Sequence, residues 1–203
     1  MLNNKKNNKN SILEEIVSCV SNVIDLNDFN ACQVNGNYEL HINVKHLLKI
    51  SKAIKDFEKL RFNQLMDITD VDFPDKENRF EMVYIFLSIN LKSRLIIKFS
   101  IDEEISIDSL SSVFPSSNWY EREIWDLFGI SFSNHPDLRR ILTDYGFVGH
   151  PLRKDFPLSG NVQVKYDITT KKVVYEPVKL TQSFRTFDFE SPWEGDLSKE
   201  NNE

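Results

Sequence analysis

The segment 119–158 holds most of the side chains in this sequence that could do chemistry. It contains four of the eight arginines and two of the four histidines, whereas most basic residues elsewhere are lysines. A guanidinium group is a rigid, planar fork of N–H donors that fits a carboxylate, while the lysine ammonium is a mobile, strongly hydrated charge. The segment is therefore predicted to fix a defined geometry, either for catalysis or for contact between surfaces.

Three hypotheses account for such a geometry. As an enzyme site, the segment would use acids and histidines for acid–base or metal chemistry: Glu121, Glu123, His135, Asp137 and His150. Their spacing matches no zinc signature, and two carboxylates two residues apart on a helix point in different directions. As an internal corner, the charged and aromatic side chains would lock the chain's own loops. As an interface, they would dock onto another protein, and the residue types favour this third hypothesis.

A helix is predicted to position the first of these residues. It begins at Trp119 with Asn118 as its N-cap, Glu121 completes a capping box, and Gly129 ends it. One face is apolar, and the opposite face carries four charged or aromatic residues: Glu121, Arg122, Trp125 and Asp126. The arginine and the aspartate in this set are four residues apart, so they are neighbours on the helix surface. Such a helix is typical of an interface.

The rest of the segment is predicted to be mostly irregular. Residues 138–142 can form one helical turn. Residues 150–157 are bounded by prolines, so they cannot form a regular helix and are expected to be an extended strap held by its side chains. The turns and the strap carry seven candidate residues: His135, Asp137, Arg139, Arg140, His150, Arg153 and Asp155.

An α+β domain over residues 11–115 is expected to carry this segment, which spans residues 116–160. A capping box at Ser11 opens a helix, Asn35-Gly36 marks a hairpin turn, and residues 79–101 alternate as two long strands. Strand pairs mixed with helices, without regular β-α-β repetition, predict a mixed sheet covered by helices on one face.

Three further segments complete the predicted organisation. The polar residues 1–10 are expected to be a disordered tail, and residues 107–114 a short helix stopped by Pro115. Residues 161–203 are expected to form a β-hairpin followed by an extended arm. That arm contains four aromatic residues spaced among polar ones: Phe184, Phe187, Phe189 and Trp193. The arm is predicted to order on a basic partner, the alternative being that it folds back on its own domain.

Composition excludes several classes of function. The net charge of −6 argues against general nucleic-acid binding, and no apolar run approaches the ~20 residues that a membrane span needs. The two cysteines, Cys19 and Cys32, are too few to hold an iron–sulfur cluster alone, and the six glycines form no dinucleotide or phosphate-binding motif. Cys19 lies on the apolar face of the first helix, so it is predicted to be a buried free thiol.

Three stretches together resemble a known family signature. They are EREIWDLFGI at residues 121–130, HPDLRRIL at 135–142 and GHPLRKD at 149–155. This pattern closely resembles that of the 30 kDa subunit family of respiratory complex I. Bacterial members of that family are designated by the letter C, and members encoded in a mitochondrial genome are called subunit 9. The resemblance extends over roughly residues 79–193.

The resemblance implies a noncatalytic subunit of the hydrophilic arm of a proton-pumping NADH:ubiquinone oxidoreductase, on the matrix side of the mitochondrial inner membrane. Such a subunit carries no cofactor of its own; complex partners carry FMN and iron–sulfur clusters. Its expected partners are other complex I subunits, especially those that hold the terminal iron–sulfur cluster and form the quinone site. Some relatives serve membrane-bound hydrogenases, so an equivalent role in such a complex is one alternative. The other is that of the enzyme hypothesis, hydrolysis by the Glu/His/Asp cluster.

Overall fold

The computed structural model describes residues 2–182, with side chains from residue 12 onward, and it divides into two compact units between Leu158 and Ser159. The predicted aromatic arm beyond residue 182 lies outside the described residues. In the first unit the helices are α1 (Leu2–Ser21), α2 (Leu47–Asp56) and α3 (Ser117–Phe128), with two short 3₁₀ helices at Leu26–Asp28 and Val44–His46. Its strands are β1 (Phe29–Val34), β2 (Asn37–Ile42), β3 (Gln64–Asp72), β4 (Phe80–Ser88), β5 (Ser93–Ile101), β6 (Ile107–Asp108) and β7 (Phe132–Ser133).

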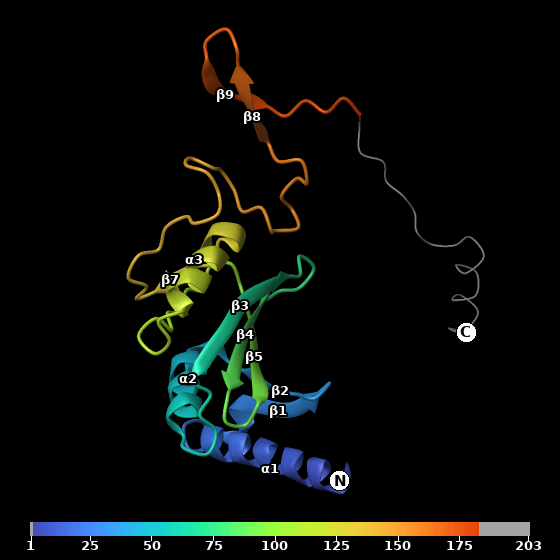
Figure 1. The fold of residues 1–203 in the computed structure, drawn as a ribbon, viewed down its shortest axis with the longest axis vertical. Coiled ribbons are helices and arrows are strands. Elements are labelled where there is room, and N and C mark those ends of the chain that lie inside the picture. Colours follow the sequence, from blue (N-terminus) through green and yellow to red (C-terminus); the bar gives the residue numbers. More distant parts are fainter. Residues whose placement is uncertain (1, 183–203) are drawn as a thin grey trace, which may run out of the picture. The chain divides into compact units, whose positions relative to one another are not determined.

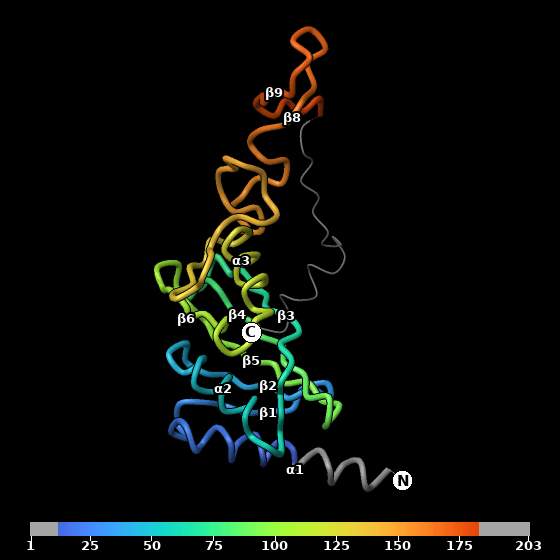
Figure 2. The backbone as a smooth tube through the Cα atoms, turned by 60° about the vertical axis from the view of Figure 1, so that its left-hand side comes forward, coloured from blue at the N-terminus to red at the C-terminus, as the bar shows by residue number. Residues whose placement is uncertain are grey.

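Five of these strands form one mixed sheet in the order β1-β2-β5-β4-β3, which confirms the α+β class. The β2–β5 pair is parallel and the other pairs are antiparallel. Figure 1 shows α1 and α2 beside the end of the sheet that holds β1 and β2, and α3 beside β3; the turned view in Figure 2 agrees. One end of the sheet is therefore left to α3 and the loops that follow it.

Side chains on the central strands alternate between buried and more exposed positions, so one face of the sheet is buried. On β4, Phe80, Met82, Tyr84 and Phe86 are buried, and the residues between them are half-buried. The buried side chains join residues of all three helices, Cys19 among them, in one hydrophobic core. The predicted burial of that thiol is confirmed.

The turn between β1 and β2 is the one that the sequence predicts. Asn35 and Gly36 have φ angles of 50° and 86°, and both are positive, as a type I′ turn requires. The turn brings β2 back antiparallel to β1 with Cys32 opposite Glu39.

Two predicted elements differ from the structure. Helix α1 begins at Leu2, so there is helix where the sequence predicts a disordered tail; residues 2–10 contain no proline or glycine that would stop a helix from extending backward. The short helix predicted over residues 107–114 is wrong. Ile107 and Asp108 instead form β6, which pairs parallel with β7, and a turn follows. Serines in this stretch favour such turns over helix interiors.

The second unit holds a β-hairpin of β8 (Val162–Asp167) and β9 (Lys172–Pro177), as predicted. The Val178 amide donates to the Asn161 carbonyl at 3.2 Å and closes the open end of the hairpin.

Candidate functional site: the signature corner

The signature corner, residues 116–158, starts with α3 and is organised by the carboxylates of that helix. The helix begins at Ser117, with Ser116 as an N-cap that makes no side-chain cap bond, so the predicted start at Trp119 with Asn118 as cap is wrong. The reason is that Glu121 does not reach back to its own helix. The predicted end is confirmed, since Gly129 takes a left-handed φ of 81°.

Glu121 is fully buried and accepts hydrogen bonds from the segment that precedes the helix. Its two carboxylate oxygens accept hydrogen bonds from the Ser109 hydroxyl at 2.6 Å and the Leu110 amide at 2.7 Å. The predicted helix does not form there because the Ile107 and Ser109 amides donate to the Ser131 and Ser133 carbonyls at 3.0 and 2.9 Å in the β6–β7 pairing. Burial raises the pKa of Glu121, and the bonds from Ser109 and Leu110 offset this only in part.

His135 lies beside Glu121 and is held in one tautomer. Its Nδ1 accepts from the Asp137 amide at 3.1 Å, so the proton lies on Nε2, which donates to the Asn118 carbonyl at 3.1 Å. The same Nε2 is 3.9 Å from a Glu121 carboxylate oxygen, and both side chains are fully buried. The histidine therefore ties the loop after α3 to the start of that helix.

Asp126 is the second organising carboxylate and is also fully buried. It accepts from the backbone amides of Ile141, Leu142 and Thr143 at 3.1, 2.8 and 2.9 Å, from the Thr143 hydroxyl, and from Arg140 at 2.7 Å. Burial alone would raise its pKa, but the bonds from Thr143, Leu142 and Ile141 outweigh burial and hold the pKa of Asp126 well below its usual range.

These bonds explain why the helical turn predicted over residues 138–142 does not form. A helix would use its own amides and carbonyls, but here Asp126 takes the amides. Arg122 takes the carbonyls, donating from Nε to Arg139 and from a terminal nitrogen to Arg140, both at 3.1 Å. The Arg122 guanidinium also lies 5.3 Å from the ring centre of Trp119.

The strap over residues 150–157 is irregular, as predicted, but it is a series of turns rather than extended chain. His150 Nδ1 lies 3.0 Å from the Asp126 carbonyl, and Arg153 Nε donates to the Phe128 carbonyl. Both side chains cross directly over Gly129, where an added Cβ would lie 2.7 Å from the histidine ring and 2.8 Å from the guanidinium. Glycine is therefore needed here both for its left-handed φ and for this close approach.

An ion-pair network that sequence reasoning missed fastens the strap to the sheet. Asp72, at the end of β3, binds Arg79 through two bonds of 2.6 and 2.9 Å and accepts from the Lys154 amide at 2.7 Å. Arg79 also reaches Asp155 at 3.2 Å and Glu103 at 2.7 Å. The bonds from Arg79 lower the pKa of Asp72, with the Lys154 amide adding to the effect. One signal was present: Asp72 falls on the buried phase of a strand.

The surface of the signature corner exposes large apolar side chains among charged ones. Six large hydrophobic side chains in it are exposed: Trp119, Leu142, Tyr145, Val148, Leu152 and Leu158. The exposed fraction is 99% for Tyr145. Among the predicted charged candidates, Asp137 and Arg139 form an exposed pair at 2.9 Å, and Glu123 is half-buried. The other nine predicted site residues are tied to the corner or to the sheet below it.

The five acids and histidines of the enzyme hypothesis are not brought together. Glu121 and His135 are neighbours, whereas His150 contacts the far end of α3. In the part of the chain that the structure describes, no three of the five place possible metal-ligating atoms within 4.8 Å of one another. The predicted interface face of α3 also needs correction, because Glu121, Arg122 and Asp126 are buried inside the chain's own fold.

The fold and the corner define an α+β protein with a mixed five-stranded sheet and a loop region bonded internally through arginines and carboxylates. The chain belongs to the family described as respiratory-chain NADH dehydrogenase, 30 Kd subunit, whose model matches residues 40–162.

Three relatives illustrate the family. An NADH-quinone oxidoreductase subunit of Paramagnetospirillum magneticum, designated C, is 54% identical over 80% of this chain and 83% of its own. NADH-ubiquinone oxidoreductase subunit 9 of Reclinomonas americana is 45% identical over 97% of both chains. NADH dehydrogenase [ubiquinone] iron-sulfur protein 3 of Beta trigyna is 56% identical over 75% of this chain and 79% of its own. The predicted complex I family is confirmed.

Over residues 2–182, no helix combines the length and apolar character that a membrane crossing demands.

Proposed function

We propose that this chain is a noncatalytic structural subunit of the hydrophilic arm of a proton-pumping NADH:ubiquinone oxidoreductase. It would brace the subunits that hold the terminal iron–sulfur cluster and form the quinone site, on the matrix side of the mitochondrial inner membrane. FMN and iron–sulfur clusters would be carried by partners, since two cysteines cannot hold a cluster alone.

The observation that carries the proposal is the two-sided construction of the signature corner. Its interior is fixed by buried bonds such as those of Asp126 and Arg122, while its surface exposes large apolar residues such as Tyr145 and Leu158. Exposed apolar side chains on a rigid support are what a docking surface needs, because a fixed backbone loses little conformational entropy on binding.

The β8–β9 hairpin supports the same proposal independently. Directly opposed residues of an antiparallel pair lie on one face, so Val162, Val164 and Tyr166 share a face with Val173 and Pro177, and all five are exposed. The other face is mostly polar. A two-stranded hairpin is marginal in water by itself, so a partner that covers its apolar face would stabilise it.

The test compares exposed apolar residues inside and outside the two proposed surfaces. We expect Tyr145→Ser and Val164→Ser to lower the amount of assembled complex resolved on native gels of membranes. The matched control is Ile89→Ser, since Ile89 is 61% exposed at the β4–β5 turn and belongs to neither surface. Circular dichroism of each purified chain checks that folding is unchanged. Equal assembly in all three variants would remove the support for docking through these surfaces.

A further inference from the structure

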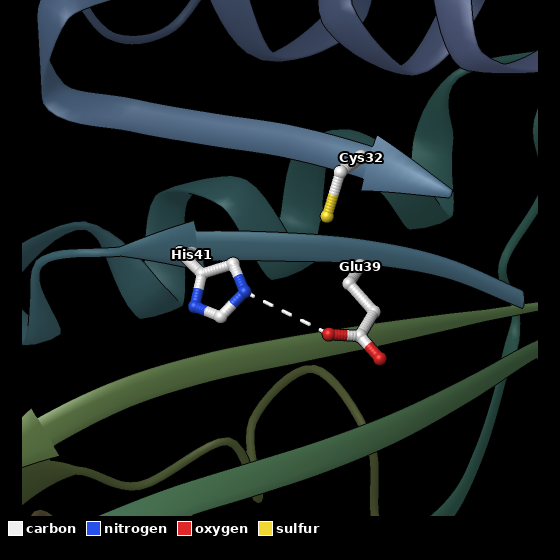
Figure 3. Close-up of side chains that lie close together, drawn as sticks. All are labelled: Cys32, Glu39 and His41. Carbon is white, nitrogen blue, oxygen red and sulfur yellow. Dashed lines mark ion pairs between the residues drawn. The ribbon is translucent and has the colours of Figure 1, made fainter. Parts of the chain in front are cut away.

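A second group of side chains, on the opposite end of the sheet from β3, has the composition of a metal site. Cys32 on β1 lies directly opposite Glu39 on β2, and His41 follows Glu39 by two residues. Because side chains alternate along a strand, all three belong to one face of the β1–β2 pair. Figure 3 shows the thiol, the carboxylate and the imidazole on that face, with the ring directed toward the carboxylate.

The three groups are close enough to share one ion. The thiol sulfur, one carboxylate oxygen and one imidazole nitrogen all lie within 4.8 Å of one another. His41 Nε2 is 3.7 Å from a Glu39 oxygen. Within residues 12–182, no other set of three or more histidines, cysteines and acids is gathered in this way. Cys32 and Glu39 are half-buried and His41 is exposed, so an ion could reach them from solvent.

One sulfur, one nitrogen and one oxygen are a donor set suited to Zn²⁺. Tetrahedral Zn²⁺ with bonds of about 2.0–2.3 Å needs its ligand atoms roughly 3.3–3.7 Å apart. Side-chain rotations that move these atoms by about 1 Å would complete the site. Three protein ligands leave a fourth position for water. The thiol loses its proton to solvent when the sulfur binds the metal, so binding strengthens as the pH rises.

Lys98 opposes such a site and offers a way to test it. Its ammonium nitrogen donates to Glu39 Oε2 at 2.8 Å from the neighbouring strand β5. A cation bound by Glu39 would have to share the carboxylate with this ammonium or displace it, and the two positive charges repel each other. Removal of the lysine charge should therefore strengthen metal binding, whereas it should have no such effect on binding by an isolated thiol.

We propose that Cys32, Glu39 and His41 form a site for one Zn²⁺ ion that fastens the edge strand β1 to β2. The edge position matters, since β1 pairs with one neighbour only in the five-stranded sheet. A ligand that binds the folded chain but not the unfolded chain adds stability by mass action. Here it would stabilise a strand that has backbone partners on one side only.

The experiment uses the purified 203-residue chain with zinc chloride as the probe. Iodoacetamide labelling followed by mass spectrometry reports whether Zn²⁺ protects Cys32. We expect protection at one equivalent of metal, unchanged in Cys19→Ser, because Cys19 is buried in the core. Glu39→Gln and His41→Asn should each weaken protection at least about tenfold, the lower end of the loss seen when even an outer partner of a metal ligand is removed. Lys98→Gln should strengthen it.

Cobalt substitution gives a second, spectroscopic measurement. Co²⁺ added to the wild-type chain should give the visible bands of a tetrahedral site and a sulfur-to-cobalt charge-transfer band, both absent in Cys32→Ser. No protection of Cys32 by excess Zn²⁺, or no cobalt bands in the wild type, would overturn the proposal. Protection as strong in Glu39→Gln and His41→Asn as in the wild-type chain would also overturn it, since the thiol would then bind the metal without the other two groups.

Discussion

Replacement of Asp126 by asparagine should destabilise the first unit more than any conservative change at its surface. The buried carboxylate accepts from three backbone amides, one hydroxyl and Arg140. Asparagine keeps the shape, but it removes the charge that pairs with Arg140 and exchanges one acceptor oxygen for an N–H donor. Hydrogen bonds to charged groups contribute about 1.5–3 kcal/mol each, and because all five here share one carboxylate, they do not add fully.

The expected loss is about 3–5 kcal/mol, the usual cost when a buried charge loses its partner. At about 2–4 °C per kcal/mol for a unit of this size, Tm should fall by roughly 6–20 °C. Thermal and urea unfolding of the purified chain, followed by circular dichroism, measure both quantities. The matched control is Asp137→Asn, whose carboxylate forms an exposed pair with Arg139 and should cost at most about 1 kcal/mol.

The pH dependence gives a second, independent check on Asp126. Its pKa in the folded chain lies well below the value of about 4 for an aspartate in an unfolded chain. The ionised carboxylate therefore stabilises the fold fully above that pH, and its contribution is lost as the pH falls through the folded pKa. The stability difference between wild type and Asp126→Asn should be constant from about pH 5 to 8 and shrink on acidification. Equal losses in Asp126→Asn and Asp137→Asn, or a difference that grows with acidification, would refute the reasoning.

Three further predictions concern folding and assembly. Gly129→Ala should lower the free energy of unfolding by about 1–3 kcal/mol in urea titrations, because the new Cβ would overlap His150 and Arg153 at a left-handed φ. Burial, with the charge of Asp72 adding, raises the pKa of Asp70 to about 7. Wild-type stability should therefore fall from about pH 4 to 7 as the folded chain resists losing this proton. Asp70→Asn should match wild type at about pH 4 and exceed it increasingly up to about pH 8 in thermal scans; parallel pH profiles would contradict this. Arg153→Ala should destabilise the isolated chain, whereas Arg139→Ala should leave its Tm unchanged and act only on assembly, which native gels would reveal.

The parts of the fold that were predictable depend on residues close together in sequence. The Asn35-Gly36 turn needs two residues with positive φ, and the alternation on β4 and β5 follows from burial of one sheet face. The end of α3 at Gly129 is likewise a local requirement. Each of these features is satisfied within a few residues, so the sequence pattern contains the necessary information.

Apart from the helix at residues 2–10, the errors occur where a polar group binds a distant partner. Residues 138–142 have helical periodicity, but Arg122 and Asp126 take their carbonyls and amides, and no local pattern reveals this competition. Glu121 has the spacing of a capping box, yet it bonds Leu110 in the preceding turn. The concentration of arginine correctly predicted a fixed geometry. It could not show that most of those arginines bind within the chain rather than across an interface.

The Asp72–Arg79 network could not be found by motif, because its members come from separate parts of the chain. The bond from the Lys154 amide to Asp72 joins the strap to β3 across 82 residues of the sequence. A weak signal existed in the acidic residues at the buried phase of β3, where an unpaired charge would be costly. Such a position demands either a cation, as at Asp72, or a retained proton, as at Asp70, and the sequence does not show which.

The most direct test of the noncatalytic role is the NADH:quinone rate of membranes divided by the amount of intact complex. Tyr145→Ser perturbs a proposed docking residue, and Glu123→Gln removes a carboxylate that the enzyme hypothesis would use. If the chain is purely structural, both variants should have the wild-type rate per assembled complex, even where the amount of complex falls. A complex of normal abundance with a markedly lower specific rate in Glu123→Gln would contradict the structural role and assign the chain a part in the chemistry.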